Sequence, residues 1–209
     1  MKTPIQSTED RIREAAGKVF MEKGYDGTTS RDIAEASGLN VAMTNYYFRS
    51  KEKLFQLTFE GFHRKFFSKM DKLINEDIPL REKVSLMVDN EYEMVDENPN
   101  LPMFVMYEMR RHPDLFPDLA PSAMRSDSVL AKQVEEAIAK GEMPPIAPVQ
   151  IMMLITSNVQ HAFIAKTLMM KATKMSEEQF TALMQQHKKT VKDMILNYLF
   201  DSTKKELTN

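Results

Sequence analysis

The chain has 209 residues, 43% hydrophobic and 28% charged, a composition that suits one large helical domain or a small module with a larger body. Its net charge of −2 is uneven, because residues 1–72 carry 13 basic and 10 acidic side chains and residues 73–209 carry 15 and 20. The sequence has no cysteine, no apolar signal core and no apolar run near the roughly 20 residues of a membrane span, so disulfide scaffolds and cysteine metal sites are excluded and we expect a cytoplasmic protein with no membrane partner.

Three short helices are predicted in the first 50 residues. The first runs from Thr8 to Lys23, ends at Gly24, and carries an apolar stripe at helical spacing: Ile12, Ala15, Ala16, Val19 and Phe20. The second covers Arg31 to Ser37 and opens on a capping box of Thr29 and Asp32. The third covers Val41 to Tyr47, with Asn40 as its N-cap.

The second and third helices meet at Gly38, and such a pair can hold its second helix in a DNA major groove. The N–H groups of residues 40–42 open that helix and suit a phosphate. Arg31 has the fork of donors that reads a guanine edge, whereas Arg49 and Lys51 suit phosphates. The slightly basic first third permits this DNA-facing function without requiring it.

The rest of the chain is also predicted to be helical, which makes the protein all-α. Ser50 caps a fourth helix, residues 51–75, that connects the DNA-binding domain, residues 1–50, to a helical ligand-binding and dimerisation domain, residues 51–209. Pro79 suits the first turn of a helix over 80–97, and further helices are expected over 100–111, 122–140, 148–172 and 176–200, about nine in all. No strand alternation and no internal repeat is found.

The ordered run from the first to the fourth helix resembles the TetR family of bacterial transcriptional regulators. The resemblance covers about residues 10–56 and rests on residues in the family's order without gaps: Ala15–Phe20, Gly24–Tyr25, Thr29, Arg31, Ile33–Ala34, Gly38–Leu39, Asn40, Ala42, Tyr46–Tyr47–Phe48, Lys51–Glu52 and Leu54. Beyond this run only the length and the helical organisation agree with the family. A packed helix–loop–helix in some other α-protein is the alternative.

The resemblance implies particular DNA contacts. Five residues would lie along the phosphates: Thr29, Asn45, Tyr46, Tyr47 and Lys51. Four would face base edges: Arg31, Val41, Ala42 and Met43. Two positions depart from the family pattern, since Asn45 stands where Tyr is common and Thr44 stands where an apolar residue usually packs.

Fourteen of the 18 methionines lie from Met87 onward, and methionine fills irregular cores as well as adaptable binding surfaces. Together with the resemblance this predicts a pocket for a largely apolar small-molecule effector. The candidate lining residues, each of which could instead belong to the plain core, are Phe62, Phe66, Met87, Met103, Met106, Tyr107, Met109, Met152, His161 and Phe163.

The last two predicted helices, about 148–172 and 176–200, have broad apolar stripes that a two-fold homodimer would bury as a four-helix bundle. A dimer also places two recognition helices about 34–36 Å apart on a near-palindromic operator. The sequence therefore predicts a cytoplasmic, ligand-responsive transcriptional repressor, with the fourth helix shifting on ligand binding.

The sequence shows no catalytic constellation, no metal-ligand spacing and no phosphate loop, so we expect neither an enzyme nor a cofactor. Two rivals remain from other classes of protein. One is an α-helical enzyme with an unrecognised site, and the other is a helical interaction or scaffold protein that kept a DNA module.

Overall fold

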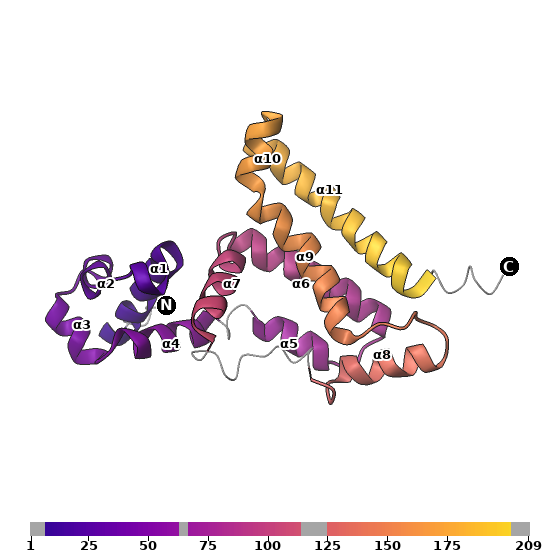
Figure 1. The fold of residues 1–209 in the computed structure, drawn as a ribbon, viewed down its shortest axis with the longest axis horizontal. Coiled ribbons are helices and arrows are strands. Elements are labelled where there is room, and N and C mark those ends of the chain that lie inside the picture. Colours follow the sequence, from indigo (N-terminus) through magenta and orange to yellow (C-terminus); the bar gives the residue numbers. More distant parts are fainter. Residues whose placement is uncertain (1–6, 63–66, 114–124, 202–209) are drawn as a thin grey trace, which may run out of the picture. The chain divides into compact units, whose positions relative to one another are not determined.

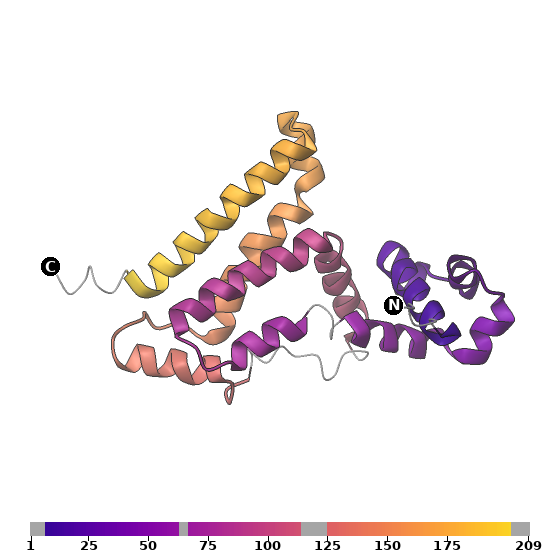
Figure 2. The same cartoon turned by 180° about the vertical axis from the view of Figure 1, so that it is seen from behind.

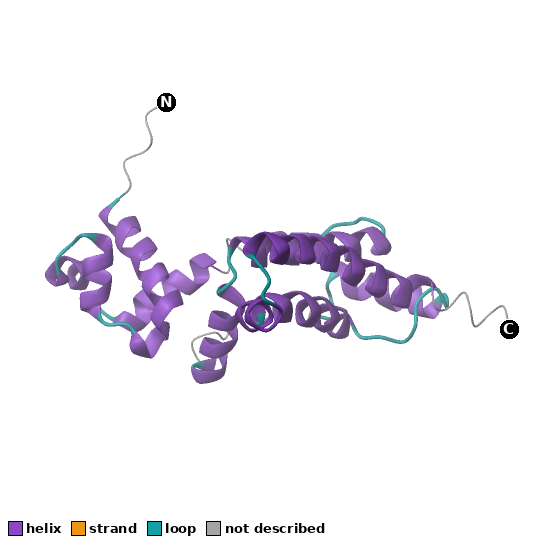
Figure 3. Cartoon of the chain, turned by 90° about the horizontal axis from the view of Figure 1, so that it is seen from above, coloured by secondary structure: helices purple, strands orange, loops and turns teal. Residues whose placement is uncertain are grey.

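The structure is a computed structural model that describes residues 7–62, 67–113 and 125–201. Over these residues it contains eleven α-helices and no strand, which confirms the all-α prediction (Figure 3). The chain divides into two compact units, Met1–Phe67 with Met103–Asp118, and Ser68–Pro102 with Leu119–Asn209. Each unit is described by itself below.

The first unit holds the helix–turn–helix and its support (Figure 1). Its helices are α1 (Thr8–Gly27), α2 (Ser30–Ser37), α3 (Val41–Tyr47), α4 (Lys51–Phe62) and all but the first two residues of α7 (Leu101–Arg111). The predicted stripe of α1 is buried, and Phe20 meets Phe55 of α4 edge to face at 4.9 Å between ring centroids. Phe104 of α7 extends this aromatic core, at 6.2 Å from Phe55.

The second unit contains α5 (Ser68–Asn75), α6 (Leu80–Glu97), α8 (Val129–Ala139), α9 (Pro148–Ile164), α10 (Lys166–Thr173) and α11 (Glu177–Leu196), followed by the π-helical turn Asn197–Asp201. Helices α9 and α11 lie side by side as an antiparallel pair with α10 at its tip, and α6 packs against both (Figures 1 and 2). The capping box of Ser176 and Gln179 opens α11, as the sequence predicts.

Helix α6 carries charged side chains into the interior of the second unit. Lys83 is fully buried, and its ammonium donates to the carbonyl of Ile74 at 3.1 Å, which caps the last turn of α5. Glu91 is also buried and accepts a hydrogen bond from the Gln160 side chain of α9 at 2.7 Å. Burial lowers the pKa of Lys83 and raises the pKa of Glu91, because a low-dielectric interior disfavours both charged forms.

The structure differs from the sequence prediction at the start of α8 and within the predicted helix from Pro148. Helix α8 begins at Val129 rather than near 122, because residues 125–128 are not helical and Ser128 caps the helix. The predicted long helix from Pro148 is interrupted at Ala165, whose N–H donates to the carbonyls of both His161 and Phe163 and so tightens the turn. The continuity of the predicted fourth helix across 63–66 lies outside the described residues.

No helix within the described ranges is both long enough and apolar enough to cross a membrane.

Candidate nucleic-acid interface

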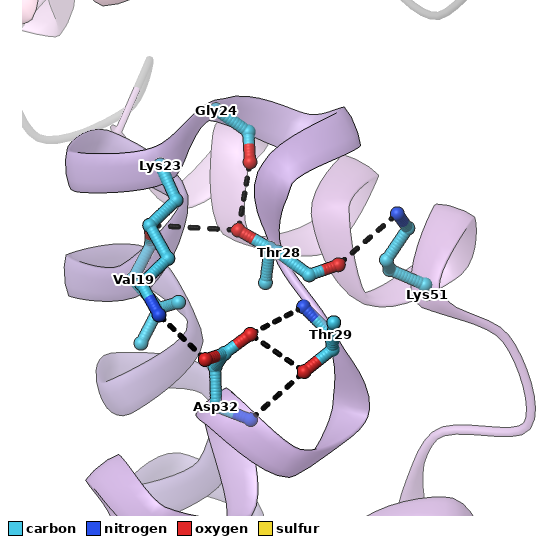
Figure 4. A network of polar contacts seen from close by, with 7 residues as sticks. All are labelled: Val19, Lys23, Gly24, Thr28, Thr29, Asp32 and Lys51. Atoms are coloured by element: carbon cyan, nitrogen blue, oxygen red, sulfur yellow. Dashed lines mark hydrogen bonds and ion pairs between the residues drawn. The ribbon is translucent and has the colours of Figure 1, made fainter.

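A polar network fixes the junction between α1 and α2 (Figure 4). Gly24 takes a positive φ of 70° and breaks the regular helix inside α1, where the sequence predicts its end. The Thr28 hydroxyl donates to the Gly24 carbonyl at 2.7 Å and lies 3.5 Å from the Val19 carbonyl. These two contacts fix the backbone at Thr28 where it leaves α1, and α2 starts two residues later.

The start of α2 is held by the predicted capping box. The Thr29 hydroxyl accepts from the Asp32 N–H at 3.2 Å, and the Asp32 carboxylate accepts from the Thr29 N–H at 2.7 Å. The Lys23 ammonium of α1 reaches the same carboxylate at 2.5 Å. The hydrogen bonds from Lys23 and then Thr29 hold the pKa of Asp32 far below its usual range, so the carboxylate remains charged at neutral pH.

Lys51, the first residue of α4, closes the junction from the other side. Its ammonium donates to the carbonyls of Tyr25 and Thr28, at 2.9 and 3.2 Å, and lies 4.3 Å from the centroid of the Tyr25 ring. Two of the three N–H groups of the ammonium are thus used inside the module. A phosphate near Lys51 would meet the remaining donor of an ammonium that the protein already holds in place.

The turn between α2 and α3 has the geometry that a helix–turn–helix needs. Gly38 adopts the left-handed conformation at φ 66° and caps α2, and the Asn40 side chain accepts from the Met43 N–H at 2.8 Å and caps α3. The Arg11 guanidinium of α1 donates to the Ser37 carbonyl at 2.9 Å. The Arg11 contact therefore ties the end of α2 to α1, and the two caps fix the turn that leads into α3.

Helix α3 buries one side and leaves the other free. Thr44 and Phe48 are buried, and the Thr44 hydroxyl lies 3.4 Å from the Asn40 carbonyl, so this polar residue at an apolar position is accommodated by its own helix. Tyr46 is 80% exposed and Tyr47 is 40% exposed, with their rings edge to face at 5.4 Å. Two large aromatic side chains that are exposed side by side suit contact with a partner.

Helix α7 contributes contacts that the sequence reasoning did not find. The Glu108 carboxylate accepts from the Tyr25 N–H at 2.9 Å, and Arg111 pairs with Asp26 at 2.5 Å. The His112 ring lies edge to face on Tyr25, with centroids 5.0 Å apart. The signal in the sequence is a glutamate at a stripe position, since Leu101, Phe104 and Glu108 share the buried face of α7.

Comparison with known proteins agrees with this geometry. Residues 12–58 match the family model described as bacterial regulatory proteins of the tetR family. The matched range contains α2, the Gly38 turn, α3 and Lys51, which are the parts that build the interface. The helix–turn–helix of this chain is a DNA-binding module of the tetR family.

Three known proteins illustrate the relationship. The Bacillus subtilis protein named "Probable HTH-type transcriptional regulator YttP" is 40% identical over 62 residues, which are 28% of this chain and 30% of that protein. The HTH-type transcriptional repressor KstR2 of Rhodococcus jostii is 30% identical over 85 residues, 41% of this chain and 42% of the repressor. These two matches thus span less than half of either relative.

The third is a solved structure, the transcriptional regulator FadR of Bacillus subtilis in complex with stearoyl-CoA. It matches with a TM-score of 0.62 and 20% identity, covering 90% of this chain and 97% of that one. At this identity the similarity establishes a shared fold across both units.

The tetR-family module places the residues predicted to contact DNA in two groups. Most are exposed or half-buried on α2 and α3, namely Arg31, Val41, Ala42, Met43, Asn45, Tyr46 and Tyr47. Thr29, Asn40 and Lys51 have polar groups engaged within the module, the first two in helix caps and the third at the α1–α2 junction. Their contacts with DNA remain predictions.

The residues predicted to line an effector pocket are distributed over both units of the chain. Phe62 and the four α7 residues Met103, Met106, Tyr107 and Met109 belong to the first unit, and the α7 residues are exposed. In the second unit Met87 and Phe163 are buried, Met152 is half-buried and His161 is exposed on α9. Phe66 lies outside the described residues. The pocket therefore stays a prediction.

Within the second unit, Phe163 and Tyr92 line a cavity of about 70 Å³ bounded by α6, α9 and α11. The Tyr92 hydroxyl is buried and has no hydrogen-bond partner among the described residues. Burial raises the pKa of Tyr92 to about 12, so the phenol stays neutral at physiological pH. A cavity of this size holds a few water molecules rather than an effector.

Proposed function

We propose that this chain is a homodimeric transcriptional repressor that binds a near-palindromic DNA operator through α3 and responds to a small-molecule effector. The observation that carries the proposal is the exposed face of α3 with Tyr46 and Tyr47, on a module held by helix caps and Lys51, together with the exposed Arg31 of α2. Phosphate contacts from such a face would supply affinity, and contacts to base edges would supply specificity. We place the protein in the cytoplasm, where its operator would be.

The dimer in this proposal pairs α9 and α11 of two copies. The inner residues of these helices are buried against their own unit, yet a second set of apolar side chains is exposed along them and on the π-helical turn that follows α11: Met153, Ile164, Leu183, Met194 and, on the turn, Tyr198. Exposed apolar groups that continue along two adjacent helices suit an isologous contact with a second copy. Two modules in one dimer would read the two halves of a palindrome.

The effector is proposed to be largely apolar. Support comes from the methionine-rich second unit and from the shared fold with FadR, which is described in complex with stearoyl-CoA. An effector acts on DNA affinity only if it binds the two arrangements of the recognition helices with different affinity. Purified protein should therefore change its operator affinity when apolar acyl compounds are added.

The decisive experiment selects duplex fragments from the source genome with purified protein and measures their affinity over a series of salt concentrations. We expect fragments to be enriched, with an affinity that falls steeply as salt rises because counterions are released from the phosphates. Arg31→Ala should reduce this affinity, and Glu60→Ala, an exposed change on α4, should not. Absence of any salt-dependent duplex binding would contradict the proposal and favour a scaffold or an enzyme.

A further inference from the structure

We propose that Glu108 of α7 is a positioning residue of the DNA interface, which it serves by holding the backbone of Tyr25 without touching DNA itself. The inference rests on the proposed DNA-binding function. It assigns a role in operator binding to a side chain far along the sequence from the helix–turn–helix.

The contact between Glu108 and the α1–α2 junction is tight and buried. Glu108 is 1% exposed, and its Oε1 accepts from the Tyr25 N–H at 2.9 Å. The preceding residue, Gly24, has no side chain, and a Cβ built there would lie 2.9 Å from the same oxygen. The positive φ and the approaching carboxylate thus both favour glycine at position 24.

Tyr25, whose N–H binds Glu108, also binds Lys51 through its carbonyl and its ring. The peptide N–H of Tyr25 is bound by Glu108, and its carbonyl accepts from the Lys51 ammonium, which also lies over its ring. Lys51 in turn binds the Thr28 carbonyl, one residue before the capping box that opens α2 (Figure 4). A continuous series of hydrogen bonds therefore runs from α7 through Tyr25 and Lys51 to the start of α2.

The chemistry of Glu108 argues for a specific role rather than simple packing. The other members of the buried stripe of α7 include Leu101 and Phe104, and an apolar side chain at position 108 would continue the stripe without a desolvation cost. The second carboxyl oxygen, Oε2, is buried with no hydrogen-bond partner among the described residues. Burying a carboxyl group with one unpartnered oxygen costs free energy. The hydrogen bond from the Tyr25 N–H to the other oxygen, Oε1, explains why a carboxyl group stands here.

Two further residues at the end of α7 contact the turn around Tyr25. The Arg111 guanidinium pairs with Asp26, and the His112 ring packs on the Tyr25 ring. These groups are partly exposed, so their pairing is weakened by solvent and cannot replace a buried hydrogen bond. Removing the Glu108 carboxyl should therefore free the Tyr25 N–H and loosen the support of Lys51, even though every residue of α2 and α3 is unchanged.

The test compares three variants of the full-length protein. Glu108→Ala removes the acceptor, Glu108→Gln keeps an acceptor oxygen at nearly the same position, and Glu60→Ala removes an exposed carboxylate on α4 of the same unit. The probe is a duplex fragment that the wild-type protein selects from its source genome. The readouts are duplex affinity, its salt slope, hydrogen exchange of the Tyr25 amide, and the far-ultraviolet circular dichroism that reports folding.

We expect Glu108→Ala to bind the duplex about tenfold more weakly, with rapid exchange of the Tyr25 amide and an unchanged helical signal. The salt slope should stay that of the wild type, because no phosphate contact has been removed. Glu108→Gln should keep the Tyr25 amide protected and bind within about threefold of the wild type, as should Glu60→Ala.

Two outcomes would overturn the inference. One is wild-type affinity in a folded Glu108→Ala protein whose Tyr25 amide exchanges freely. The other is equal weakness of the alanine and glutamine variants, which would show that the acceptor oxygen is not what matters. If the wild-type protein selects no duplex at all, the proposed DNA-binding function fails instead, and the two failures are thereby distinguished.

Discussion

At the scale of single residues, substitution of Tyr46 should change the affinity for DNA while leaving the stability of the fold nearly unchanged. The side chain is 80% exposed, so Tyr46→Ala should change the free energy of unfolding by less than about 0.5 kcal/mol. If its hydroxyl donates to a phosphate, losing that charge-assisted bond should weaken duplex binding about tenfold. Tyr46→Phe isolates the hydroxyl and should lose most of the same affinity. Full retention of binding by Tyr46→Ala would remove Tyr46 from the interface.

Glu91 should make the free energy of unfolding depend on pH. Burial raises its pKa in the folded protein above the ordinary value of 4.5, so the fold favours the protonated acid. The favourable contribution is complete below the unfolded-state pKa and is lost as the pH rises through the raised, folded-state pKa. At pH 7 the folded protein therefore bears a cost that a neutral side chain would avoid.

Glu91→Gln should consequently raise the free energy of unfolding at pH 7 by on the order of 1 kcal/mol, with little difference near pH 4. The amide oxygen can still accept from the Gln160 side chain, so the hydrogen bond is retained. Urea unfolding at several pH values measures the effect. Glu97→Gln, an exposed change on the same helix, should stay within about 0.5 kcal/mol at every pH, and a destabilised Glu91→Gln protein would refute the reasoning.

At the scale of elements, the turn between α2 and α3 depends on one backbone conformation. Gly38 sits at φ 66° and ψ 28°, which costs a residue with a Cβ about 1–2 kcal/mol. Space is not the obstacle, since a Cβ there would meet the Arg11 guanidinium at an ordinary 3.6 Å.

Gly38→Ala should therefore lower the free energy of unfolding by about 1–2 kcal/mol through the backbone alone. Gly38→Asn should lower it less, because asparagine tolerates the left-handed region. Thermal unfolding followed by circular dichroism compares the two. Equal loss in both variants would point to the side chain rather than to φ.

The elements also show which parts of the fold a sequence predicts. The breaks and caps of α1 to α3 are predicted well, because local chemistry marks them: Gly24 and Gly38 at positive φ, the capping box of Thr29 with Asp32, and Asn40 as an N-cap. The start of α8 lies later than predicted, because Ser128, and not an earlier residue, supplies the cap. The interruption at Ala165 carries no proline or glycine and so left no local signal.

The contacts of α7 could not be predicted for a different reason. Its methionines suggested a pocket lining by composition, yet Met103, Met106 and Met109 are exposed while Glu108 is buried. Helical spacing from Leu101 and Phe104 does place Glu108 on the inner face. Nothing local, however, names Tyr25 as its partner, because the two residues are 83 positions apart and only tertiary packing brings them together.

At the scale of the whole molecule, the proposed function requires two copies, and the apolar face of α9 and α11 makes that requirement testable. Met153 of α9 is 61% exposed and Met194 of α11 is 48% exposed, so a glutamate at either position would be solvated in a single copy. Buried between two copies, the same carboxylate would meet apolar surface and its own symmetry mate.

Met153→Glu and Met194→Glu, singly and combined, should therefore dissociate the protein without unfolding it. Sedimentation at micromolar concentration should give twice the chain mass of 24.2 kDa for the wild type and a single chain mass for the double variant. Duplex affinity should fall in parallel, since a lone module reads only half of the palindrome.

Met106→Glu, an equally exposed change on α7, should leave the mass unchanged. A double variant that keeps the dimer mass would place the two-fold contact on another face, and a wild-type protein that sediments as one chain would remove the dimer from the mechanism.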